Sequence, residues 1–369
     1  MTKRIGIVSI APGAPDPSGM SFDWYMTRFG RNTGNYMFTQ AMFRQLTGEL
    51  HHLSFDFDVS RIGEEFDHLV IPAANWMNEK SDWTAMADWI EAAPVPVTVI
   101  GLGLQASSQD LAEVKVSDSA IRLARVLSSK SPHISVRGDF TRDWLLSIGV
   151  RNVVTTGCPS LYMRLNDPAL ARNEGELVLQ STRYYMTQAF LNHPGTNRDV
   201  FGLAGKYDTH MIYQSEFNEI ERMVFGRVTE GTPGEALMPA LYGLETDADY
   251  HAYLARRGHV FCDLDEWSGF LQGTAGVIGT RLHGSILALN SGVPAILIPH
   301  DSRTGELVDF AAIPTIHPEG IASYTRADLH AVLHGADIGR FLDTRSRNGL
   351  IYRQFLRDCG LDCREENML

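Results

Sequence analysis

One stretch of the chain, Gly276–Asp301, constrains the fold more than any other. It starts with a short apolar run, continues into a helical pattern at Ser285–Asn290, and ends with a second apolar run at Val293–Ile298. This spacing predicts a strand, a tight turn, a helix and a second strand. Such a unit is typical of a parallel α/β sheet, in which the turns at the carboxyl ends of the strands bind ligands.

The rest of the chain repeats this alternation of strand and helix patterns. In the first half we expect strands at Arg4–Ile10, Leu53–Phe57, His68–Pro72, Val95–Leu102, Ile134–Val136 and Val153–Thr155. Helical patterns lie between them at Tyr36–Leu46, Trp83–Ala93, Ser117–Ser128 and Asp139–Ile148. In the second half we expect strands at Leu177–Ser181, Thr209–Gln214, His259–Cys262, Gly276–Gly279 and Ala295–Pro299. The alternation predicts parallel sheets covered by helices, and two Rossmann-like domains facing across a cleft are the simplest such architecture.

A boundary between these two domains is indicated where the pattern weakens, at residues 165–175. This segment contains Asn-Asp-Pro and Asn-Glu-Gly, which favour turns and loops. We therefore predict an N-terminal domain at residues 1–168 and a C-terminal domain at 175–335. Residues 337–369 have the pattern of one or two helices, which we expect to cross back to the N-terminal domain.

Charge and hydropathy restrict the partners of the chain. The net charge of −12 argues against nucleic acid as a partner. No apolar stretch approaches the roughly 20 residues of a transmembrane segment. The first apolar run is followed by a Pro-rich loop, Pro12–Pro17, instead of a signal-peptide cleavage site. We expect a cytoplasmic protein, and peripheral association with the inner face of the membrane remains compatible with these features.

The turn after the strand at Gly276–Gly279 carries the strongest chemical signal. Arg281 can bind a carboxylate or a phosphate through its planar guanidinium group, and His283 can exchange a proton near neutral pH. The neighbouring Leu282 and Gly284 would line the same anion site. Together these residues indicate chemistry on an anionic substrate, while a buried histidine of the core is the alternative for His283.

Further candidate residues follow other expected strands. Arg137 comes directly after the strand Ile134–Val136, and the adjacent Gly138 would leave it exposed as a second ligand for an anion. The remaining cleft candidates also lie in loops or at strand ends: Asn32, Gly34, Asn35, Gln105, His300 and Asp301. Loops without a chemical role are the alternative for Asn32–Asn35 and for Gln105. His300 and Asp301 could orient a substrate or only cap the following helix.

The sequence contains no convincing metal-binding pattern. The histidines show no paired ligand spacing, and the four cysteines form neither a zinc pattern nor a disulfide framework. We therefore predict no metal site and reduced, structural thiols.

Three of these segments resemble motifs of the polysaccharide pyruvyl transferase family, in the same order. The segment from Gly279-Thr-Arg281-Leu-His283-Gly to Asp301 resembles the C-terminal signature of that family. Ser135-Val-Arg137-Gly, continued by Thr156-Gly157-Cys-Pro-Ser, is similar to the middle motif of the family. Asn32-Thr-Gly34-Asn35 is similar to the N-terminal loop of the family. The chain differs from the family pattern at Asn35, where an acidic residue is common, and at Ala73–Asn75, where a glycine-rich stretch is common.

The resemblance implies a fold like that of two-domain GT-B glycosyltransferases, with the N-terminal domain on the acceptor side. It implies an enzyme of surface polysaccharide synthesis that moves the pyruvyl group of phosphoenolpyruvate onto two hydroxyls of a saccharide, forming a cyclic ketal. Arg137 and Arg281 would bind phosphoenolpyruvate, and His283 would act as the acid/base. Phosphoenolpyruvate would be the donor substrate, with no further cofactor, and the acceptor could be lipid-linked.

Two other hypotheses remain at this point. A GT-B glycosyltransferase would use the same residues to contact the diphosphate of a nucleotide sugar. A non-catalytic protein on the same scaffold would bind a saccharide or an anion without turning it over. The sequence does not distinguish the acceptor sugar, the linkage or the oligomeric state.

Overall fold

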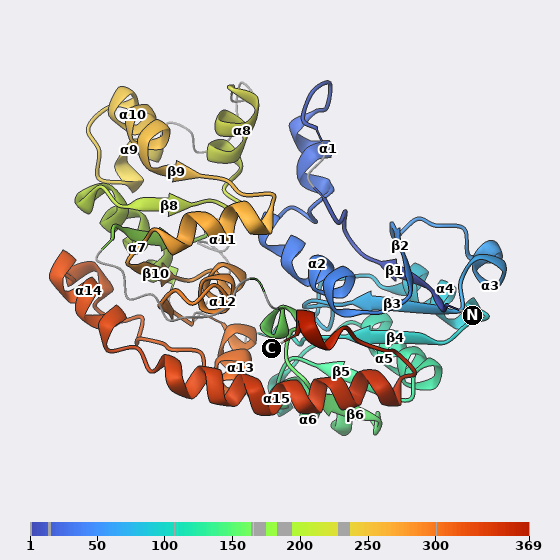
Figure 1. The fold of residues 1–369 in the computed structure, drawn as a ribbon. Helices are drawn as coiled ribbons and strands as arrows, with labels where there is room; N and C mark the ends of the chain where they lie inside the picture. The colour runs from blue at the N-terminus through green and yellow to red at the C-terminus, as the bar shows by residue number, and fades with distance from the viewer. Residues whose placement is uncertain are drawn as a thin grey trace.

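The computed structural model describes residues 2–13, 16–106, 108, 110–163, 165, 175–182, 194–227, 237–299 and 301–368. The strands of these residues fall into two groups, β1–β6 from the first half of the chain and β7–β11 from the second. Neighbouring strands within each group are parallel. Figure 1 shows the two groups side by side, each flanked by helices. The predicted α/β fold with two Rossmann-like halves is therefore confirmed.

The first group forms a parallel sheet in the order β2-β1-β3-β4, continued by the pair β5-β6. A bridge between Leu102 and Val136 connects the chain after β4 to β5. The strands are β1 (Arg4–Val8), β2 (Glu49–Leu53), β3 (His68–Pro72), β4 (Val97–Ile100), β5 (Ile134–Val136) and β6 (Val153–Thr155). The helices are α1 (Phe22–Thr27), α2 (Tyr36–Gln45), α3 (Ile62–Glu65), α4 (Thr84–Ala92), α5 (Asp118–Lys130) and α6 (Asp139–Ser147). Strands β3, β4 and β5 are buried along their whole length, as their apolar runs require.

The second group forms a five-stranded parallel sheet in the order β11-β10-β7-β8-β9. Its strands are β7 (Leu177–Gln180), β8 (His210–Ile212), β9 (Gly258–His259), β10 (Gly276–Gly279) and β11 (Ala295–Leu297). Its helices are α7 (Pro194–Tyr207), α8 (Phe217–Phe225), α9 (Met238–Leu241), α10 (Asp247–Arg257), α11 (Leu264–Gln272), α12 (Leu282–Asn290), α13 (Ser302–Ala311) and α14 (Arg326–His334). Helix α12 follows the central strand β10 and is buried on nearly all sides.

The long helix α15 (Ile338–Asp358) contacts both halves of the molecule. The hydroxyl of Tyr352 donates to Gln45 Oε1 at the end of α2 (3.1 Å). Nη1 of Arg345 donates to Asn290 Oδ1 at the end of α12 (2.9 Å). In Figure 1, α15 runs in red along the lower edge of both groups. Within the ranges that the structure describes, no helix combines the length and apolar character needed to cross a membrane.

Three predicted elements differ most from the structure, and β1, β4, β7, β8 and β11 are shorter than the predicted strands. The predicted strand Leu53–Phe57 is wrong: β2 is Glu49–Leu53, and Phe57 instead packs against Trp89, with ring centroids 4.8 Å apart. The error arose because β2 is a half-exposed edge strand of mostly polar residues, so that the apolar signal came from the loop behind it. Strand β9 is only two residues long, and α12 begins at Leu282, ahead of the predicted helical pattern Ser285–Asn290. The predicted domain boundary, between residues 168 and 175, lies outside the described residues.

Candidate active site

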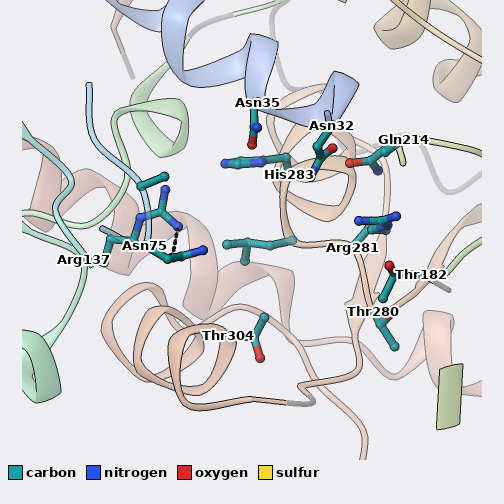
Figure 2. Close-up of a pocket in the computed structure, with 12 residues that line it drawn as sticks. Asn32, Asn35, Asn75, Arg137, Thr182, Gln214, Thr280, Arg281, His283 and Thr304 are labelled. Carbon is teal, nitrogen blue, oxygen red and sulfur yellow. Dashed lines mark hydrogen bonds between the residues drawn. The ribbon is translucent and has the colours of Figure 1, made fainter. Parts of the chain in front are cut away.

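The candidate site lies at the carboxyl ends of parallel strands from both halves, where an α/β sheet binds its ligands. Arg281 follows β10, Gln214 follows β8 and Thr182 follows β7. Arg137 follows β5 and Asn75 follows β3, both from the first half. All five side chains line one pocket, which Figure 2 shows with Arg137 on one side, Arg281 on the other and His283 between them.

Arg281 is held by a buried ion pair. It precedes the first turn of α12, and only 6% of its surface is exposed. Its Nε donates to the carbonyl of Ser181 (2.9 Å), and its Nη2 donates to the hydroxyl of Ser215 and the carboxylate of Glu216. Glu216 also accepts from the backbone N–H of Gln214 (2.9 Å). Nη1 of Arg281 has no hydrogen-bond partner among the described residues, so this nitrogen is available to a ligand.

A buried glutamine supports the turn that carries Arg281. Nε2 of Gln180 donates to the carbonyl of Arg281 (2.9 Å), and its Oε1 accepts from Nε2 of Gln214 (3.3 Å). A Cβ at Gly279 would overlap the backbone carbonyl of Gln180, and a Cβ at Gly284 would overlap its side-chain oxygen. Both glycines are therefore needed for the close approach of β10 and α12 to this glutamine. Gly284, which we predicted at the donor site, packs here and does not line the pocket.

Arg137 reaches across the ends of the first sheet. Arg137 is only 2% exposed, so the exposure that we expected from the adjacent Gly138 is wrong. Nε donates to the carbonyl of Gly101 (3.0 Å), Nη1 to Asn75 Oδ1 (3.2 Å) and Nη2 to the carbonyl of Ala73 (3.4 Å). These contacts come from the loops that follow β3 and β4, so the end of the sheet itself positions the guanidinium group beside the pocket.

His283 lies inside the first turn of α12, because this helix begins at Leu282. Both Leu282 and His283 line the pocket, and the imidazole is 8% exposed. Nε2 of His283 lies 3.9 Å from the thiol of Cys158, and the ring centroid lies 5.8 Å from that of Phe38. The helix start therefore brings a nearly buried imidazole between the two arginines.

The N-terminal loop covers the pocket from the first half. Asn32 Oδ1 accepts from the N–H of Gly34 (2.9 Å), and Asn35 Nδ2 donates to the carbonyl of Phe29 (3.2 Å). Both asparagines line the pocket, and Figure 2 shows the side chain of Asn35 directed toward His283. Gly34 lies beside the pocket instead, since a Cβ there would overlap the side chain of Gln214.

Two connected cavities make up the site. The inner one, described above, has a volume of about 60 Å³. The outer one, of about 350 Å³, is lined in addition by Arg31, Trp76, Gln105 and Phe217. Both cavities share Asn32, Asn35, Ala74, Asn75 and Arg281. A small anion and a larger second substrate could therefore meet at these shared residues.

The remaining predicted residues have different positions. Gln105 lines the outer cavity, and its buried Nε2 has no hydrogen-bond partner among the described residues. Asp301 caps α13 by accepting from the N–H of Thr304 (2.9 Å), which is the capping role that the sequence left open. His300 lies outside the described residues. No group of three or more His, Cys, Asp or Glu residues suited to a metal occurs in the part of the chain that the structure describes.

A buried carboxylate joins the two halves next to Arg137. Glu306 of α13 accepts from the N–H (3.0 Å) and the hydroxyl (2.8 Å) of Thr141, at the start of α6. Burial raises the pKa of Glu306 to about 7, against the opposing effects of the bonds from Thr141 and the charge of Arg137. This carboxyl group can therefore change its charge near neutral pH.

Sequence reasoning missed several residues of the site. The most important is Glu216, the ion-pair partner of Arg281, and the others are Asn75, Gln180, Thr182, Gln214 and Thr280. A signal was present, because each of these polar residues ends or closely follows a buried strand. The strand-end argument that selected Arg137 and Arg281 would have selected them as well.

The comparisons with known proteins identify a family. A family model for polysaccharide pyruvyl transferase matches residues 32–302, which is more than half of the chain. No curated protein sequence matches the chain.

Solved structures with a similar chain path include three nucleotide-sugar epimerases. One is a putative UDP-N-acetylglucosamine 2-epimerase from Listeria monocytogenes, with 10% identity and a TM-score of 0.47, covering 97% of this chain and 98% of that one. Another is the UDP-N-acetylglucosamine 2-epimerase from Rickettsia bellii, with 10% identity and a TM-score of 0.48, covering 97% of this chain and 96% of that one. The third is the Neisseria meningitidis enzyme bound to UDP-GlcNAc (10%, 0.46, 95% and 100%). At these TM-scores the likeness supports no conclusion about substrates.

Proposed function

This chain belongs to the polysaccharide pyruvyl transferase family, and from that premise we propose that it transfers the pyruvyl group of phosphoenolpyruvate to a saccharide. The product would be a cyclic ketal across two hydroxyls of a surface polysaccharide precursor. The observation that carries the proposal is the meeting of Arg137, Arg281 and His283 around one small pocket. A lipid-linked acceptor would bring the protein to the cytoplasmic face of the membrane.

The inner cavity suits the charge of phosphoenolpyruvate. This donor carries a carboxylate and a phosphate, and two guanidinium groups face the cavity from opposite halves. Among its described lining residues there is no Asp or Glu. Arg281 would bind one anionic group through Nη1, while Glu216 fixes the orientation of its guanidinium. Arg137 would bind the other group from the opposite side.

His283 is placed to move the proton that the reaction requires. Protonation of the methylene carbon of phosphoenolpyruvate would leave an electron-deficient C2, to which the first sugar hydroxyl adds. The hydroxyl proton returns to the imidazole. The oxygen of the second hydroxyl then bonds to C2 as the bond from C2 to the phosphate oxygen breaks, and its proton leaves with the phosphate as HPO₄²⁻, which closes the ketal. One residue thus donates and accepts a proton in the first step, while the arginines stabilise the charge on the leaving phosphate.

The outer cavity is the proposed acceptor site. It opens from the same residues that cover the donor cavity, so a saccharide there would reach the donor beside His283. Oδ1 of Asn35 remains available after Nδ2 has donated to Phe29, and it could accept a bond from a reacting hydroxyl. The Trp76 ring, which lines this cavity, packs against the tilted ring of Trp83, whose centroid lies 4.8 Å away.

The test is calorimetric titration of the protein with phosphoenolpyruvate, UDP and GDP. We expect phosphoenolpyruvate to bind, and Arg281→Lys to weaken binding by about tenfold or more, because lysine keeps a charge beside Glu216 but loses the fork. His283→Ala should retain binding and lose turnover. Binding of UDP or GDP without phosphoenolpyruvate would favour the glycosyltransferase hypothesis, and wild-type turnover in His283→Ala would refute the assigned acid/base.

A further inference from the structure

At Asn32 and Asn75 the outer cavity presents hydrogen-bond donors, because the acceptor ends of these two amides are already used within the protein, whereas Asn35 leaves its acceptor end. Asn32 Oδ1 accepts from the N–H of Gly34, and Asn75 Oδ1 accepts from Arg137. Each of these bonds fixes which end of the amide is left for a ligand, namely the NH₂ group. Gln105 adds a buried Nε2 without a partner among the described residues. A ligand rich in oxygen acceptors would satisfy these groups.

The cavity is also cationic, in a chain whose net charge is −12. Two arginines, Arg31 and Arg281, line it, and its described lining contains no Asp or Glu. Arg281 also lines the donor cavity, where Glu216 balances its charge. Arg31 lines the outer cavity but not the donor cavity, so a ligand in the outer cavity can contact it without involving the donor site.

Arg31 adopts an unfavourable backbone conformation. Its φ angle is +62°, following Gly30 at +56°, and a residue with a side chain adopts this region at a cost in free energy. Strained residues of this kind concentrate at ligand-binding sites. The Arg31 guanidinium lies 4.8 Å from the ring centroid of Phe217, and its Nη1 lies 2.7 Å from Asp23 Oδ1. The turn therefore places the guanidinium beside the Phe217 ring and the Asp23 carboxylate.

The ion pair with Asp23 does not prevent ligand binding. The Arg31 and Asp23 side chains are 52% and 76% exposed, and exposed pairs contribute little to stability. An anionic ligand can therefore share the guanidinium with Asp23 or replace it at small cost. Bonds between a guanidinium and a carboxylate or phosphate are among the stronger hydrogen bonds in proteins.

From these observations we propose that the outer cavity selects a saccharide that carries an anionic oxygen group, a carboxylate or a phosphate, and that Arg31 binds this group. The inference rests on the proposed function in one respect, namely that the saccharide is the pyruvyl acceptor. Arg31 is then a specificity-determining residue for the acceptor, distinct from the two arginines assigned to the donor.

The proposal is tested by titrating glucose, glucuronate and glucose 6-phosphate into the protein, with and without saturating phosphoenolpyruvate. Glucuronate carries a carboxylate and glucose 6-phosphate carries a phosphate, so that comparing their affinities shows which of the two groups the cavity prefers. We expect at least one of them to bind about tenfold more tightly than glucose, because it gains a charge-assisted bond. Arg31→Asn, which tolerates the positive φ, should remove this preference, and Arg31→Lys should keep part of it.

Two controls separate this proposal from the proposed function. Arg61→Gln removes an exposed arginine that pairs with Glu65 and lines neither cavity, and it should change nothing. Arg31→Asn should leave phosphoenolpyruvate affinity unchanged within about twofold, because two other arginines hold the donor. Failure of the wild type to bind phosphoenolpyruvate would count against the proposed function alone.

Four outcomes would overturn the proposal itself. Glucose could bind as tightly as both anionic sugars, or neither anionic sugar could bind. The preference for an anion could also persist in Arg31→Asn. A loss of phosphoenolpyruvate affinity in Arg31→Asn as large as that in Arg281→Lys would assign Arg31 to the donor site instead.

Discussion

The replacement Glu306→Gln tests how burial controls the charge of a carboxyl group between the two halves. Glu306 is 7% exposed and accepts two hydrogen bonds from Thr141. Its pKa is raised from the ordinary 4.5 to about 7, chiefly by burial. Glutamine keeps the neutral form and one acceptor oxygen, so the substitution removes the titration while preserving most of the contact.

The size and sign of the effect follow from linkage between folding and protonation. Each unit by which the pKa differs between the folded and the unfolded chain corresponds to about 1.4 kcal/mol in the free energy of unfolding. The rise of the Glu306 pKa from 4.5 to about 7 therefore corresponds to about 3 kcal/mol. Because the folded pKa is the higher one, Glu306 contributes this stability fully below pH 4.5 and loses it as the pH rises through about 7. At pH 8 the wild type has therefore lost this contribution to its stability, whereas Glu306→Gln has no carboxyl group to ionise at this position.

Thermal unfolding of both proteins at pH 5 and pH 8 measures the effect. For 369 residues, the entropy of unfolding is about 0.8 kcal/mol per degree, so 3 kcal/mol corresponds to about 4 °C. The Tm of Glu306→Gln relative to the wild type should rise by about this amount between the two pH values. Comparing the two proteins cancels the titration of all other groups. A difference that stays constant between pH 5 and pH 8 would refute the reasoning.

Two further predictions concern the packing around Arg281. Glu216→Ala leaves Arg281 buried without its partner, which should reduce the free energy of unfolding by about 3–5 kcal/mol and lower Tm by several degrees. As a control, Glu65→Ala removes the partner of Arg61 in an exposed pair and should have little effect on Tm. Gly279→Ala forces a Cβ onto a backbone carbonyl and should cost about 1–3 kcal/mol or more. Gly269→Ala in α11 meets nothing within 4 Å and should instead raise Tm slightly. Similar Tm values for Glu216→Ala and Glu65→Ala, or for the two glycine variants, would contradict these arguments.

Parallel strands made of short, mainly apolar runs were the most predictable part of the fold. The bounds of β3, β5, β6 and β10 match the predicted strands, because each is a short run of mainly apolar residues with turn or polar residues after it. The edge strand β2 was not predictable in this way, since its residues Glu49–Leu53 are largely polar and half exposed. Its pairing with β1 is decided by backbone hydrogen bonds, which leave little trace in the pattern of side chains.

The site was predictable as far as its position on the sheets, but not as far as its internal contacts. Arg137, Arg281 and His283 were selected because they follow strands, and the structure brings all three to one pocket. The pairing of Arg281 with Glu216 joins residues 65 positions apart. Nothing in the local sequence of either residue indicates the other, because the contact depends on how the loops after β8 and β10 meet.

The glycines of the Arg281 segment show that a sequence motif can combine two physical requirements. In the proposed reaction Arg281 and His283 would supply the charge and the proton carrier, while Gly279 and Gly284 admit the backbone and side chain of Gln180. Gln180 in turn binds the carbonyl of Arg281 and thereby fixes the start of α12. The glycines thus act on the chemistry only through the position of the helix. A larger residue at either glycine should therefore displace Arg281 and His283 together, even though it would contact no substrate.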